Sequence, residues 1–360
     1  MATIFVVTGG KGMKILDTTI RDGSYAIDFK FSCDDVADIA GKLEQLGFEY
    51  IEIGHGQGLH ASSPEHGIAL HSDIEYMHAA RSVLKNSKFG FFCIPGIADI
   101  KDLYMAKENG VSFVRMGVNA DQPEIAREYI AEAKKLGMTV MANFMKSYII
   151  TPEKFAENAT LVESYGADCV YIVDSAGCMF SEELGAYYDA VKRKSNIQVG
   201  YHGHNNLGLA VANSIYCAEK GFDFIDCSLQ GLGRSLGNAS TEMVVMALTK
   251  MGYPMNIDIP QLLEYGYMLL KEIVKGDLQN PLDLVCGYAG FHSGFLKDIY
   301  RCCNEKKVDP LRLIIEYTNI DRKSMDYEKL CQVAELLPKD FERHPYKFTE
   351  FFSSIYNDLC

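Results

Sequence analysis

Two hydrophobic patterns alternate along the chain as far as Met251. Short apolar runs typical of buried strands are followed by longer stretches in which apolar residues recur at helical spacing. The predicted strands are residues 13–18, 50–54, 89–93, 113–116, 139–144, 169–173, 198–202 and 224–228. The predicted helices that follow them are residues 34–46, 73–84, 97–108, 121–136, 152–165, 182–194, 206–220 and 239–251. This alternation indicates βα units and a parallel sheet.

Several of the predicted helices end in a glycine followed by an apolar residue, which is a common signal that a helix stops before the next strand. Gly47, Gly110, Gly137, Gly166 and Gly221 stand at such ends. Eight βα units match a (β/α)₈ barrel, which typically takes about 250 residues. A doubly wound open sheet would more often show fewer strands and a glycine-rich fingerprint after the first strand. We therefore predict an α/β protein in which residues 13–256 form a (β/α)₈ TIM barrel.

The pattern changes after Pro254, where helical periodicity continues without strand-like runs. The predicted helices in this part are residues 262–274, 294–303, 309–317, 326–337 and 347–359. We therefore predict that residues 257–360 form a C-terminal helical domain.

The composition is that of an ordinary globular protein, with 48% hydrophobic and 23% charged residues. No apolar run reaches the ~18 residues that a membrane-spanning helix requires. Residues 1–14 hold only a short apolar patch with no basic residue before it, which does not fit a secretory signal. We expect a cytoplasmic protein with no membrane partner.

The charge balance bears on the choice of partner. A formal net charge of -13, from 48 acidic and 35 basic residues, argues against a surface that binds nucleic acid. The 11 cysteines include no Cys-x-x-Cys spacing, so we expect reduced thiols and neither a zinc ribbon nor a disulfide framework. Composition does not reveal the reaction, which has to be inferred from motifs.

The seventh predicted strand leads into two histidines separated by one residue. His202 and His204 can direct both imidazoles to one point, because side chains two apart along a strand lie on the same face. A single His-x-His pair is a weak signal, and either ring could serve only as a hydrogen-bonded loop residue. The pair becomes a candidate metal site only with a further ligand.

The end of the first predicted strand supplies that ligand. Asp17 lies at its carboxyl end, Arg21 and Asp22 follow closely, and strands one and seven are near neighbours in a closed barrel. Alternatively, the carboxylates of Asp17 and Asp22 could cap turns, which is plausible for one of them but less plausible for the two together. Two imidazoles and one carboxylate, which we expect to come from Asp22, form a three-ligand site suited to Mn²⁺, Mg²⁺ or Zn²⁺.

These motifs resemble those of a known enzyme family. The run 17–23, Glu52 and residues 202–208 together are similar to the signature of the DRE-TIM metallolyases. Residues 51–59, 163–167, 210–214 and 284–290 resemble one branch of that superfamily, the 4-hydroxy-2-oxovalerate aldolases. The resemblance spans residues 14–300 and fades over the rest of the chain.

The resemblance implies a class II, metal-dependent aldolase. Such an enzyme reversibly cleaves a 4-hydroxy-2-oxo acid to pyruvate and an aldehyde, with a divalent metal, usually Mn²⁺ but also Mg²⁺, Co²⁺ or Zn²⁺, held by Asp22, His202 and His204. The metal and the Arg21 guanidinium would stabilise the negative oxygen of the pyruvate enolate. The remaining implied roles are substrate binding by Arg21, Ser175, His202 and Glu52, with Glu52 orienting Arg21, and a weak or outer metal ligand at Asn238.

The sequence departs from the aldolase pattern at two positions. The family has a catalytic histidine where this chain has Tyr25, and a tyrosine where this chain has His292. Because imidazole titrates near neutral pH and phenol near pH 10, we hypothesise that His292 is the catalytic base and Tyr25 its hydrogen-bonding partner. Alternatively, Tyr25 is a packing substitution and His292 an unrelated loop residue. Both positions lie where the aldehyde would leave, so the aldehyde half of the substrate stays open.

Two other functions remain as alternatives. One is acyl-CoA lyase or Claisen-type synthase chemistry on the same scaffold, and the other is a catalytically silent barrel that acts as a binding subunit. The resemblance further implies an acylating aldehyde dehydrogenase as a partner, and the chain could form a homo-oligomer.

Overall fold

The computed structural model describes residues 12–274, 278–321, 324–339, 347 and 350–352. These residues divide into two compact units. The first contains the described residues up to Ile257 together with 272–274, and the second contains residues 258–271 and the described residues from 278 onwards.

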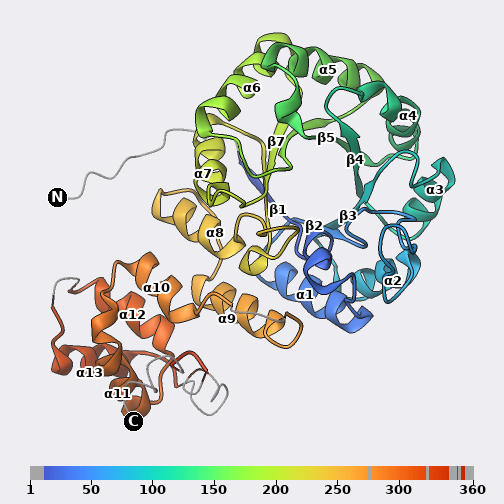
Figure 1. Ribbon diagram of the computed structural model, residues 1–360. Helices are drawn as coiled ribbons and strands as arrows, with labels where there is room; N and C mark the ends of the chain where they lie inside the picture. Colours follow the sequence, from blue (N-terminus) through green and yellow to red (C-terminus); the bar gives the residue numbers. More distant parts are fainter. Residues whose placement is uncertain (1–11, 275–277, 322–323, 340–346, 348–349, 353–360) are drawn as a thin grey trace. The chain divides into compact units, whose positions relative to one another are not determined.

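The first unit is a closed barrel of parallel strands in the order β1 to β8, with β8 pairing back onto β1 (Figure 1). The strands are β1 (Lys14–Asp17), β2 (Tyr50–Ile53), β3 (Lys88–Cys93), β4 (Phe113–Asn119), β5 (Thr139–Met145), β6 (Cys169–Asp174), β7 (Gln198–Gly203) and β8 (Phe224–Cys227). Every predicted strand is present, and the predicted (β/α)₈ barrel is confirmed.

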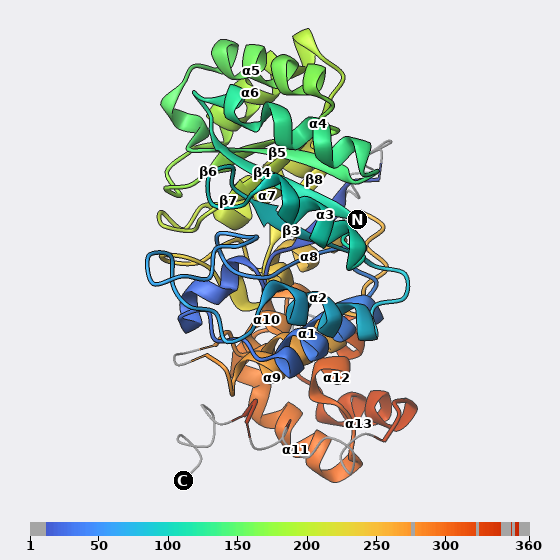
Figure 2. The same cartoon turned by 90° about the vertical axis from the view of Figure 1, so that its right-hand side faces the viewer.

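A ring of helices surrounds the strands, and Figure 2 shows the same arrangement from the side. The helices are α1 (Cys33–Gln45), α2 (Asp73–Val83), α3 (Ile100–Glu108), α4 (Arg127–Lys135), α5 (Pro152–Tyr165), α6 (Ser181–Lys194), α7 (Ala210–Lys220) and α8 (Thr241–Lys250). The helix predicted from residue 206 begins only at Ala210, because Gly208 adopts a left-handed conformation with φ of 72°. The helix predicted over 121–136 is divided into a short 3₁₀ helix, η2 (Pro123–Ala126), and α4.

Large side chains fill the barrel interior below its carboxyl end. A buried cluster of Leu16, Tyr50, Phe113, Met141, Cys169, Tyr171, Val173 and Phe224 closes the centre. Gly200 makes room for this packing, because a Cβ at its position would lie 2.5 Å from the ring of Tyr171. This part of the interior is therefore a packed apolar core.

The described residues of the second unit are helical. They form α9 (Ile259–Leu270), α10 (Pro281–Ala289), the 3₁₀ helix η5 (Ser293–Phe295), α11 (Leu296–Lys306), α12 (Pro310–Thr318) and α13 (Tyr327–Leu336). Helix α10 is absent from the prediction, although Asn280 caps its start and Gly290 ends it with φ of 71°. Most of the helix predicted over 347–359 lies outside the described residues.

Lys347 is buried in this unit between two acidic side chains. Its ammonium forms an ion pair with Asp309 and lies 2.9 Å from a carboxylate oxygen of Glu264. The charge is thereby paired away from water, as burial of a lysine requires. Across the part of the chain that the structure describes, no helix is both long and apolar enough to cross a bilayer.

Candidate metal centre and active site

A tight turn after β1 sets the position of Asp22. The backbone N–H of Asp22 donates to the carbonyl of Thr18 at 2.8 Å, and the 3₁₀ helix η1 (Asp22–Ile27) starts there. Asp17 braces this turn, since its carboxylate accepts from the backbone N–H of Thr19 at 2.9 Å and from the Thr241 hydroxyl at 3.2 Å. Burial raises the pKa of Asp17 to about 6. The two carboxylates of the motif therefore occupy different environments, and Asp17 has the capping contacts.

Asp22, His202 and His204 converge at the carboxyl ends of β1 and β7. Each residue offers a ligand atom, these atoms lie within 4.8 Å of one another, and all three residues are buried. Nε2 of His202 lies 3.7 Å from Oδ2 of Asp22, and the two imidazole rings are almost perpendicular, at 87°. The arrangement brings together the three residues named as metal ligands from the sequence.

Several buried polar atoms at this point have no hydrogen-bond partner among the described residues. They are Oδ2 of Asp22, Nδ1 of His204 and Oδ1 of Asn238. Unsatisfied buried groups of this kind are costly, and a bound cation would satisfy oxygen and nitrogen lone pairs together. The donor set therefore fits a divalent metal, with Asn238 able to contribute a fourth ligand atom.

The local charges keep these groups in the protonation states that ligation needs. Burial alone would raise the pKa of Asp22, but the Arg21 guanidinium and the two nearby imidazoles outweigh it and hold that pKa well below its usual range. Burial lowers the pKa of His204, which favours a neutral imidazole.

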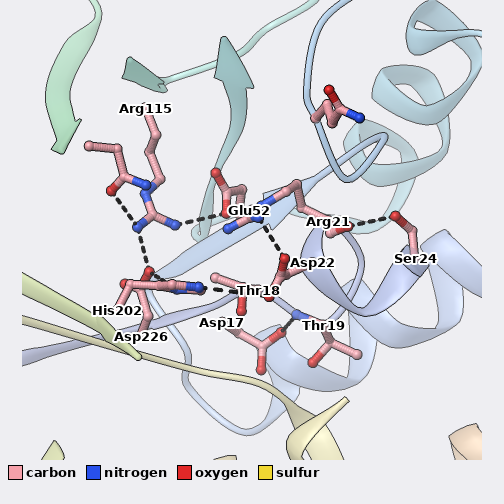
Figure 3. Close-up of polar contacts among 12 residues, drawn as sticks. Asp17, Thr18, Thr19, Arg21, Asp22, Ser24, Glu52, Arg115, His202 and Asp226 are labelled. Carbon is pink, nitrogen blue, oxygen red and sulfur yellow. Dashed lines mark hydrogen bonds and ion pairs between the residues drawn. The ribbon is translucent and has the colours of Figure 1, made fainter. Parts of the chain in front are cut away.

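Arg21 lies between Glu52 and the proposed ligand Asp22 (Figure 3). Its Nε donates to Glu52 at 2.8 Å and its Nη1 to Asp22 at 2.9 Å, while its guanidinium lies 4.9 Å from the centre of the Phe92 ring. Its Nη2 has no partner among the described residues. Arg21 is thus held on two sides, with an unused N–H group at the site.

A buried charge network behind the site contains residues that the sequence analysis did not identify (Figure 3). Arg115 on β4 is fully buried; it donates to Glu52 at 2.8 Å and forms an ion pair with Asp226 on β8. Asp226 in turn lies 2.9 Å from Nδ1 of His202. The sequence feature that could have revealed this network is the single arginine, Arg115, within the apolar run 113–118, because a charge in a buried strand needs partners.

A cavity of about 480 Å³ opens over the site at the barrel mouth. Its lining includes Arg21, Asp22, Tyr25, Lys146, Ser175, His202, His204 and Arg234. The hydroxyl of Ser175 accepts the backbone N–H of Lys146 at 2.9 Å. Glu52 is fully buried and contacts Arg21, so any effect on substrate would act through the guanidinium.

His292 belongs to the second unit, where it caps η5. Its Nδ1 accepts the backbone N–H of Gly294 at 3.1 Å, and the residue is exposed. Its assignment as catalytic base stays a prediction, as do the catalytic and binding roles assigned to the other residues of the site.

The fold and the site define a (β/α)₈ barrel with an Asp–His–His ligand set at the carboxyl ends of its first and seventh strands. The chain belongs to the HMGL-like family, which matches residues 12–268. This membership confirms the resemblance to the DRE-TIM metallolyases.

Curated relatives are similar over most of the chain. The 4-hydroxy-2-oxovalerate aldolase of Carboxydothermus hydrogenoformans is 37% identical over 334 residues, covering 91% of this chain and 98% of the relative. The enzyme of the same name from Pelotomaculum thermopropionicum is 38% identical over 304 residues, covering 84% of this chain and 90% of the relative.

Solved structures support the fold. Hydroxymethylglutaryl-CoA lyase from Pseudomonas aeruginosa superposes with a TM-score of 0.66 at 19% identity, covering 77% of this chain and 98% of that one. At this identity the likeness concerns the barrel architecture only.

Proposed function

We propose that this protein is a metal-dependent aldolase that reversibly cleaves a 4-hydroxy-2-oxo acid to pyruvate and an aldehyde. The observation that carries the proposal is the unused Nη2 of Arg21 beside the ligand set of Asp22, His202 and His204. The names of the curated relatives, which are 4-hydroxy-2-oxovalerate aldolases, support the same reaction.

Asp22, His202 and His204 would hold the metal, with Oδ1 of Asn238 as a further ligand atom. We propose Mn²⁺, because this mixed nitrogen and oxygen set suits it; Mg²⁺, Co²⁺ and Zn²⁺ are the competitors. When bound, the cation supplies Lewis-acid stabilisation of the negative charge that develops on the substrate.

The guanidinium of Arg21 would act on the developing enolate. In cleavage, the bond between the third and fourth substrate carbons breaks, and its electron pair moves towards the ketone oxygen of the pyruvate half. Nη2 of Arg21 would donate to that oxygen, and the contacts of Arg21 with Glu52 and Asp22 would keep the guanidinium in place during the reaction. Ser175, on the cavity wall, would bind the substrate carboxylate.

Cleavage also needs a base to accept the proton of the substrate hydroxyl. Burial raises the pKa of Tyr25 above its ordinary value, so its phenol would be a poor base near neutral pH. We therefore propose the imidazole of His292 as the acceptor, with Tyr25 as its partner. An acylating aldehyde dehydrogenase that receives the aldehyde, and a homo-oligomeric state, are further proposals from the family resemblance.

Exchange of the pyruvate methyl protons in deuterated water tests the proposed reaction. Metal-stripped protein supplied with each of the four cations should exchange these protons only when a metal is added, and fastest with Mn²⁺. His204→Gln should lose both metal binding and exchange. Activity with an acyl-CoA alone would indicate the lyase or synthase alternative, and tight metal binding with neither activity would indicate a binding subunit.

A further inference from the structure

An arginine at the rim of the cavity has no carboxylate partner. Arg234 lines the same cavity as Arg21 and the metal ligands, and it is exposed. Its guanidinium lies 5.2 Å from the centre of the Tyr25 ring. Within the described part of the chain, no ion pair joins Arg234 to an acidic side chain.

The loop between β8 and α8 holds Arg234 close to the metal ligands. The backbone N–H of Gly237 donates to the carbonyl of Arg234 at 3.0 Å, which closes a turn. The N–H of Asn205, next to His204, donates to the carbonyl of Gly237 at 2.9 Å. Gly237 has φ of 85°, and a Cβ there would lie 2.2 Å from the carbonyl oxygen of Gly231, so the turn depends on glycine. The backbone that carries Arg234 is therefore tied to the loop that carries His204.

The charges around the cavity are unbalanced in favour of cations. Arg21, Lys146 and Arg234 line it, whereas Asp22 is its acidic lining residue and is already paired with Arg21. The pyruvate half of the substrate would be bound by the metal, Arg21 and Ser175. Arg234 is not used in binding that half. Its guanidinium lies against the ring of Tyr25, the position that the family resemblance assigns to the leaving aldehyde.

We infer that Arg234 recognises an anionic group on the aldehyde half of the substrate. The inference rests on the proposed aldolase function and defines a substrate class: 4-hydroxy-2-oxo acids that carry a carboxylate or phosphate beyond the hydroxyl carbon. A guanidinium presents its N–H groups as a planar fork that matches either anion. The ring of Tyr25 supports the guanidinium through a cation–π contact, which gives a reason for an aromatic residue here.

Aldol addition with matched acceptors tests this inference. Pyruvate is supplied with butanal or 4-oxobutanoate, and separately with glycolaldehyde or glycolaldehyde phosphate, and kcat/KM is measured for each aldehyde. The wild type should favour the anionic aldehyde of at least one pair. A preference for 4-oxobutanoate over butanal would indicate a carboxylate, and a preference for glycolaldehyde phosphate over glycolaldehyde would indicate a phosphate. Arg234→Ala should lower that anionic-to-neutral ratio roughly 10- to 100-fold, the usual range for a lost hydrogen bond to a charged group.

Two further variants sharpen the result. Arg234→Lys should retain part of the preference, because it keeps the charge and loses the fork. Arg193→Ala, which removes an exposed arginine on α6, should leave the ratio unchanged. An equal ratio in the wild type and Arg234→Ala, with proton exchange intact, overturns this inference alone. Absence of metal-dependent exchange in the wild type overturns the proposed function and this inference together.

Discussion

Asp226 lies 2.9 Å from Nδ1 of His202, on the opposite side of the imidazole from Asp22. A carboxylate in this place accepts a hydrogen bond from the Nδ1–H group, so the Nε2 lone pair is directed towards the metal position. His202 is thereby held in one orientation and one tautomer before any metal binds.

Asp226→Asn should therefore weaken metal binding. The variant loses the carboxylate that orients His202, and contacts of this kind are usually worth about 10- to 100-fold in metal affinity. Titration of metal-stripped protein with Mn²⁺ by calorimetry measures the change. Asp189→Asn, which alters a half-buried surface pair with Lys220 away from the site, is the matched control. Equal affinity in the wild type and Asp226→Asn would show that His202 needs no carboxylate to orient it.

Arg115→Met should lower the free energy of unfolding by about 3–5 kcal/mol, because it leaves Glu52 and Asp226 buried without the cation that they share. Urea unfolding of the metal-free protein measures this loss. The control Arg193→Met removes an exposed arginine, whose ion pair should contribute at most about 1 kcal/mol. A similar effect of both variants would contradict a structural role for the Arg115 network.

The contrast between the metal ligands and this network shows how far the sequence alone can be interpreted. His202 lies near the end of β7, His204 follows two residues later in extended continuation of it, and Asp22 follows β1, so local periodicity and barrel closure were enough to group them. Arg115 and Asp226 meet across the barrel interior from β4 and β8. That meeting depends on strand register and on which side chains fill each interior layer, and neither is encoded in a local pattern.

The same distinction applies to the fold. Strand positions were predicted closely because each is a short apolar run between clear turn signals. Helix starts were less accurate, as at Ala210, because the left-handed conformation of Gly208 delays the first hydrogen-bonded turn and cannot be deduced from hydrophobic spacing. Arg234 gave no sequence signal, since its importance depends on the cavity that its loop borders.

Two buried carboxylates of the barrel, Asp17 and Glu242, should contribute less stability as the pH rises from about 4 to about 7. Burial raises the pKa of Asp17 from 3.8 to about 6 and that of Glu242 from 4.5 to about 7. At these two groups the folded state binds more protons than the unfolded state, so their contribution to stability is complete below the ordinary pKa and declines up to the raised one. The lowered pKa values of His204 and His55 act in the opposite direction below their ordinary value of 6.5, and the lowered pKa of Asp22 does so below 3.8.

Chemical unfolding of metal-free protein at several pH values checks this dependence. Glu242→Gln removes one of the two titrating groups and should flatten the decline, whereas Glu182→Gln, on the exposed side of α6, should not. The same pH dependence of stability in Glu242→Gln and in the wild type would contradict the raised pKa of Glu242.

His292→Asn should abolish aldol cleavage while leaving the fold and the metal site in place. Asparagine is a good N-cap, so it can still accept the N–H of Gly294 at the start of η5, but it cannot accept a proton from the substrate. Loss of a general base usually lowers kcat by about 10²- to 10⁴-fold. Tyr25→Phe, which keeps the ring under Arg234 and removes only the hydroxyl, should lower kcat less. Mn²⁺ affinity, measured in parallel, should be equal in His292→Asn and the wild type. Cleavage at the wild-type rate by metal-loaded His292→Asn would rule out His292 as the base. Tyr25 would then be a packing substitution and His292 an unrelated loop residue.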